Sequence, residues 1–136
     1  MKQTMMLIGC VAGLLLAPAA VRAESPLGEQ MESVGHAFKA LRGEQDAEKG
    51  AATARSAQEA MLKAIPILPE TVTKLEDPAA KAKAAAEYRL MMGRLYVTFC
   101  EVEQAFLAKD LAKVATLMDA LKAHKKDGHT RFMEKE

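Results

Sequence analysis

Four stretches of this chain carry apolar residues at alternating spacings of three and four, and that pattern constrains the fold more than any other feature. Such spacing places the apolar side chains along one stripe of an α-helix. In the first stretch the stripe consists of Leu27, Met31, Val34, Phe38 and Leu41. We predict helices over 26–42, 46–65, 77–109 and 111–132.

The breaks between these stretches define how the helices connect. Gly43 follows the first, Pro66 follows the second, and Asp110 stands where it can cap the last. The connections at 43–45 and 109–110 are short, which makes neighbouring helices antiparallel. We therefore predict an all-α protein, an antiparallel up-down-up-down four-helix bundle.

Two further features refine this prediction. The stripe of the second helix is made of small residues, including Gly50, Ala54 and Ala57, which would let a neighbouring helix approach closely. The segment 66–77 is the longest loop, and its several aliphatic residues predict that it packs on the bundle.

The first 23 residues are predicted to be a cleaved Sec signal peptide. Lys2 precedes an apolar run that is too short for a membrane span, and Ala23 suits the cleavage position. The mature domain would be 24–136, without a transmembrane segment, in the periplasm. The less favoured alternative is a lipoprotein anchored at Cys10, since Leu-Ile-Gly-Cys resembles a lipobox.

The charge of the mature chain argues against several function classes. Loss of Lys2 and Arg22 takes the basic residues from 19 to 17 against 18 acidic ones, a net charge of about −1. A chain with this charge lacks the excess of basic residues that is typical of nucleic-acid-binding proteins. No nucleophile–base pair or phosphate loop stands out, so we do not expect an enzyme. We expect a monomer, with Cys100 as a small core hydrophobe.

Bundle geometry draws attention to Met31 and His129. The start of the first helix and the end of the last share one pole of such a bundle, so these side chains should face each other there. A thioether opposite an imidazole in an apolar pocket is an axial pair of low-spin haem. Simpler interpretations stay open, with Met31 as core filler and His129 as a solvated helix-end residue.

Three segments resemble the cytochrome b562 family of periplasmic b-type cytochromes. "SPLGEQMESV" is similar to the family's Leu-x-x-x-Met opening, and "LKAHKKDGHTRF" to the family's closing histidine segment. "KLED", residues 74–77, resembles the link into the third helix. The resemblance implies one non-covalent haem b, Met31 and His129 as the axial ligands of its iron, and electron transfer with periplasmic redox partners.

The resemblance also implies a pocket wall and exposes some departures. Tyr88 and Met92 would line the pocket from the third helix, where the family pattern implies aromatic residues at both. Lys125 stands where an arginine is expected. Gly128, directly before the histidine, is unusual inside a helix, and we interpret it as loosening the last turn.

The alternative function is a haem-free bundle that binds a metal such as copper through methionine and histidine, or that acts as a sensor or scaffold. A site made from all three histidines, His36, His124 and His129, lacks the i, i+4 spacing of helical metal sites. Covalent haem attachment is excluded, because the chain contains no Cys-x-x-Cys-His motif.

Overall fold

The computed structural model describes residues 25–133, and this part of the chain is helical without any strand. The helices are α1 (Pro26–Leu41), α2 (Ala47–Ala64), α3 (Glu70–Thr73), α4 (Pro78–Leu107) and α5 (Leu111–Phe132). The all-α class is confirmed, and the four long helices agree with the predicted ones to within two residues. The predicted signal peptide lies outside the described residues.

Each long helix begins at a residue whose side chain caps it. The side-chain oxygens of the capping residues accept backbone N–H groups three positions on, which satisfies donors that the first turn leaves free. These caps are Ser25, Asp46, Asp77 and Asp110. Gly43 follows α1 with a φ of 72°, a left-handed conformation that glycine adopts without strain.

The short helix α3 was not predicted. It forms a single turn inside the segment 66–77, which we expected to be an irregular loop. Val72 turns inward and is only 1% exposed. The Thr71 hydroxyl donates a hydrogen bond of 2.7 Å to the carbonyl of Phe132. The segment therefore lies on the bundle, as its aliphatic residues predict, and it is tied to the last residue of α5.

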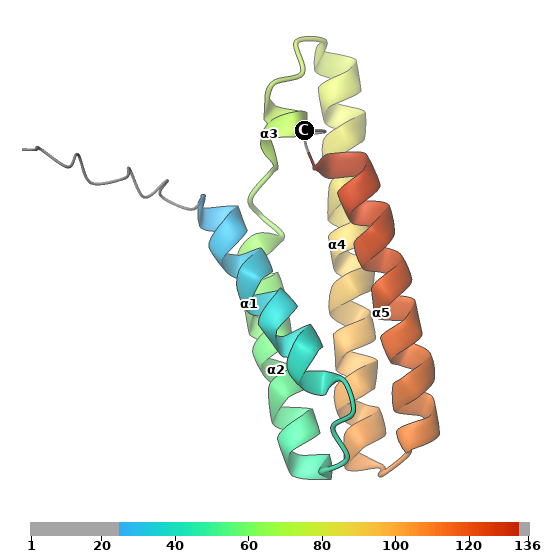
Figure 1. The fold of residues 1–136 in the computed structure, drawn as a ribbon. Coiled ribbons are helices and arrows are strands. Elements are labelled where there is room, and N and C mark those ends of the chain that lie inside the picture. Colours follow the sequence, from blue (N-terminus) through green and yellow to red (C-terminus); the bar gives the residue numbers. More distant parts are fainter. Residues whose placement is uncertain (1–24, 134–136) are drawn as a thin grey trace, which may run out of the picture.

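Helices α2 and α4 form the centre of the bundle, with α1 packed on α2 and α5 packed on α4. Figure 1 shows the α1–α2 and α4–α5 connections at one end of the molecule and α3 at the other. Within residues 25–133, α1 and α5 form no comparable packing with each other. The two helices diverge toward the α3 end, so one side of the bundle is open there (Figure 1).

A close approach between α2 and α4 depends on a glycine. A Cβ atom added to Gly50 of α2 would lie 2.3 Å from a ring carbon of Phe106 on α4. The Phe106 side chain is completely buried, and so are Ala54 and Ala57 on the same face of α2. The small-residue stripe thus has the role that the sequence predicts for it.

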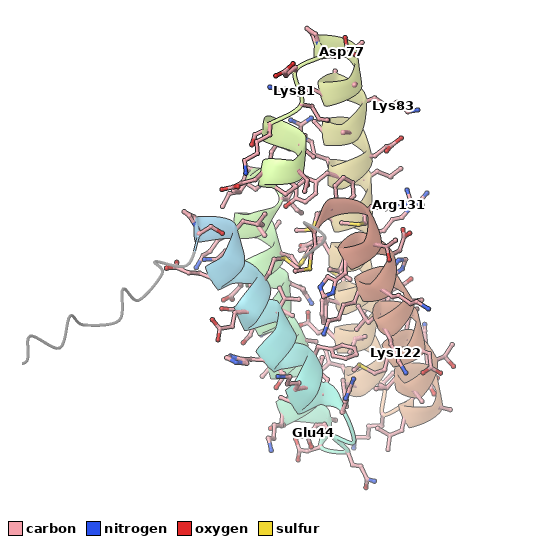
Figure 2. The ribbon with its side chains drawn as sticks, turned by 45° about the horizontal axis from the view of Figure 1, so that its top comes forward. Glu44, Asp77, Lys81, Lys83, Lys122 and Arg131 are labelled. Carbon is pink, nitrogen blue, oxygen red and sulfur yellow. The ribbon has the colours of Figure 1, made fainter. Side chains whose placement is uncertain are left out.

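The outer surface is charged. In Figure 2 the labelled side chains of Lys83, Lys122 and Arg131 point away from the bundle. Cys100 is half-buried rather than a full member of the core, and its hydrogen bond with Tyr96 raises the pKa of that phenol. None of the described helices combines the length and apolar character needed to cross a membrane.

Candidate functional site

A cavity of about 520 Å³ lies between α1, α4 and α5, with Pro69 and Glu70 at its α3 side. Its volume falls within the roughly 300–1,000 Å³ that small-molecule and cofactor sites occupy. It fills the part of the bundle where α1 and α5 do not pack on each other. The open side of the helix bundle is therefore the place where a sizeable ligand can be held.

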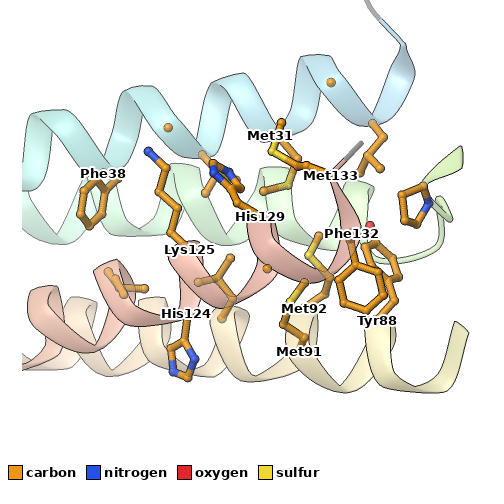
Figure 3. Close-up of a pocket in the computed structure, with 18 of the residues that line it drawn as sticks. Met31, Phe38, Tyr88, Met91, Met92, His124, Lys125, His129, Phe132 and Met133 are labelled. Atoms are coloured by element: carbon orange, nitrogen blue, oxygen red, sulfur yellow. The ribbon is translucent and has the colours of Figure 1, made fainter. Parts of the chain in front are cut away.

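Met31 and His129 both line this cavity, Met31 from α1 and His129 from α5. Figure 3 shows the two side chains pointing into the space between these helices. Met31 is half-buried, while His129 is exposed and free to meet a ligand. The structure thus brings together the thioether and the imidazole that the sequence places at the same pole.

Aromatic and apolar side chains of α4 and α5 form one wall of the cavity. The Tyr88 ring packs edge-on against Phe132, with centroids 5.5 Å apart and ring planes at 78°. Its hydroxyl donates to the carbonyl of Ala64 at 3.3 Å, and burial raises the pKa of Tyr88 to about 12. Tyr88 therefore stays neutral. Met92 beside it is 2% exposed.

Gly128 lets α5 approach α4 closely. A Cβ atom at this position would lie 3.0 Å from the Sδ atom of Met91 on α4. Our interpretation that Gly128 loosens the last turn is wrong, because α5 continues as a helix to Phe132. The glycine instead allows contact with α4 one residue before His129.

Three lining residues add features beyond the predicted ligand pair. Met91 and Met133 bring further thioethers to the cavity. Their signal in the sequence is weak, because Met91 lies next to the stripe of its helix and Met133 follows the last helical residue. Lys125 adds a cation, its Nζ atom 5.8 Å from the centroid of the Phe38 ring. This cation can pair with a carboxylate on a ligand.

The other two histidines have different surroundings. His36 lies on the surface with its Nε2 atom 3.6 Å from Glu32, and it does not line the cavity. His124 touches the cavity wall, but in Figure 3 its ring points away from Met31 toward α4. Across residues 25–133, no group of three histidine, cysteine or acidic side chains could hold a metal ion.

Comparison with known protein families decides what kind of bundle this is. The cytochrome b562 family model matches residues 26–133, a span that contains all five helices. The chain belongs to the cytochrome b562 family. Members of this family bind haem and carry electrons, and they are not typically enzymes. Comparisons with curated proteins and with solved structures find no match.

The residues present fit a haem. The cavity has the volume and the apolar walls that a large flat aromatic ligand needs. A methionine sulfur and a histidine nitrogen, an established axial ligand pair of haem iron, project into it from different helices. Lys125 supplies a positive charge in the same lining, where an acidic group of the cofactor could be neutralised.

Proposed function

We propose that this protein is a periplasmic electron carrier that holds one non-covalent haem b, with Met31 and His129 as its axial ligands. The observation that carries the proposal is the meeting of these two side chains in one apolar cavity of a cytochrome b562 family member. When bound, the haem iron supplies one-electron oxidation and reduction.

The side chains of this chain have distinct parts in that function. His129 offers a lone pair only as the neutral imidazole, while the Met31 sulfur is a neutral donor at any pH. A methionine ligand raises the reduction potential of haem iron. Tyr88 on α4 and Phe132 on α5 form an aromatic wall that would shield a bound haem from water, and an apolar surrounding of this kind tunes the reduction potential. Met31 on α1 and His129 on α5 would hold the haem from two different helices of one bundle.

The same proposal includes the topology, the processing and the location. We infer the antiparallel up-down-up-down order, supported by the positions of the connections in Figure 1 and by cytochrome b562 itself, a standard example of that order. We infer that residues 1–23 are a Sec signal peptide and that 24–136 act as a monomer with periplasmic redox partners. The mass of the exported protein tests the cleavage after residue 23, because acylation at Cys10 would retain residues 10–23.

A reduced-minus-oxidised absorbance spectrum tests the function directly. Protein recovered from periplasm with haem supplied should show a strong Soret band with sharp α and β bands. Acidic organic solvent should extract the pigment, because the haem is not covalently attached. A colourless protein that does not take up haemin would overturn the proposal and leave the haem-free alternative, a metal-binding, sensor or scaffold bundle.

Ligand variants test the two residues separately. Met31→Ala should leave a five-coordinate, high-spin haem, whereas His129→Ala should lose most of the haem affinity, since histidine is the stronger ligand. His124→Ala is the matched control, because His124 touches the same cavity but points away from Met31. It should keep the low-spin spectrum. Low-spin spectra in both ligand variants would refute the assignment.

A further inference from the structure

Sulfur is concentrated at this cavity. Of the nine methionines in the chain, Met31, Met91, Met92 and Met133 line it. Met61 and Met118 are the other methionines among the described residues, and they lie away from the cavity, Met61 being completely buried in the core. Methionines that served only to fill gaps in packing would be expected throughout the core.

These four thioethers are not equally available to a ligand. Met92 is 2% exposed and Met91 lies against Gly128, so both are held in the α4 wall. Met133 is 58% exposed at the end of α5, although it is a large apolar residue. Met31, His129 and Met133 all line the cavity, and the view in Figure 3 draws the three side chains in the same region between α1 and α5. Two thioethers and one imidazole therefore border one accessible space.

This set of donor atoms is selective for soft metal ions. Thioethers are soft, neutral ligands that favour Cu(I), and imidazole binds copper as well. Harder divalent ions prefer carboxylates, and among the described residues that line the cavity the one carboxylate belongs to Glu70. Its Oε2 atom lies 2.6 Å from the Lys74 ammonium. The described lining of the cavity offers several soft donors and a single carboxylate, which already has a partner.

We propose that the haem-free protein binds one Cu(I) ion through the sulfur atoms of Met31 and Met133 and the imidazole of His129. The methionine side chains have three rotatable bonds each and can adjust to a three-coordinate ion. Because Met31 and His129 are also the haem ligands proposed above, haem and Cu(I) exclude each other. The copper site does not require that haem binding be correct, since it uses donors that are present in the cavity in either case.

Anaerobic titration of the haem-free protein with Cu(I), in competition with a chromophoric Cu(I) chelator, tests the site. A Cys100→Ser background removes the free thiol, which lies outside the cavity and would bind Cu(I) by itself. One equivalent of Cu(I) should bind. Met133→Leu should weaken binding by about tenfold or more, because even the loss of a residue that only supports a metal ligand costs about 10–100-fold in affinity, whereas Met118→Leu should leave it unchanged.

The same variants separate this inference from the haem proposal. Met133→Leu should keep the low-spin haem spectrum, because Met133 is not a proposed haem ligand, and a haem-loaded sample should not take up Cu(I). Copper binding in the absence of haemin uptake would sustain the copper site and remove the haem proposal. If Met133→Leu bound Cu(I) as tightly as the parent, or the parent bound none, the copper site would be refuted.

Discussion

Replacement of Gly50 by alanine offers a quantitative test of the helix packing. The added Cβ atom would lie 2.3–2.6 Å from three carbons of the Phe106 ring, whereas carbon atoms in favourable contact are about 3.5–4.0 Å apart. Phe106 is completely buried, so its ring cannot turn into solvent. Relief of the overlap requires α2 and α4 to separate by about 1 Å.

Two effects of opposite sign determine how much Gly50→Ala changes the free energy of unfolding. Overpacking of a core costs about 1–3 kcal/mol, while alanine is favoured over glycine inside a helix by about 1 kcal/mol. Gly50→Ala should therefore lower the free energy of unfolding by up to about 2 kcal/mol. Gly93→Ala is the matched control, because no atom lies within 4 Å of a Cβ added there, and it should stabilise the protein by about 0.5–1 kcal/mol.

Urea and thermal unfolding followed by far-ultraviolet circular dichroism measure both variants under the same conditions. A difference of about 2 kcal/mol between them should separate their melting temperatures by roughly 8 °C or more. Equal stability of the two variants would refute the claim that Gly50 permits the close approach of α2 to α4. The measurement should be made without haem, so that the stability reports the protein alone.

Three further variants test the surroundings of the cavity. Above pH 10 the unfolded chain loses the Tyr88 proton first, because burial raises the folded pKa to about 12. Between pH 9 and pH 11 the free energy of unfolding of the parent, measured with urea, should therefore fall by about 1 kcal/mol more than that of Tyr88→Phe. The same dependence on pH in both proteins would contradict this. Thr71→Val removes the hydrogen bond to Phe132 and should cost about 0.5–1.5 kcal/mol, with faster amide exchange in α3 as the readout. Gly128→Ala should change thermal stability by less than about 1 kcal/mol, because the flexible end of Met91 can move aside, and a larger loss would show that it cannot.

The sequence was sufficient to predict the four long helices and the placement of Met31 and His129 at one pole. Helix positions follow from apolar periodicity and capping residues, which are local signals. The common pole of Met31 and His129 follows from helix order and from their distance to the helix ends. Neither argument needs knowledge of side-chain packing, and this is why both could be made from the sequence.

Features that depend on packing between distant segments could not be predicted. Periodicity shows which face of a helix is apolar, but it does not show that α1 and α5 stay apart. Gly128 of α5 lies against Met91 of α4. The pattern within one helix does not show a contact with another helix, so the reason for a glycine at this position could not be predicted and we misinterpreted it. Met133 follows the last helical turn and belongs to no stripe, so nothing in the pattern pointed to it.

The open side between α1 and α5 links the lifetime of the protein to the supply of its ligand. Each of these helices is held mainly by one neighbour, so a molecule that bridges them completes the ring of contacts. A ligand at a hundred times its dissociation constant adds about 2.7 kcal/mol to the free energy of unfolding. In a compartment that contains proteases, chains that fail to acquire the ligand would be degraded first, and the amount of protein would follow the amount of ligand.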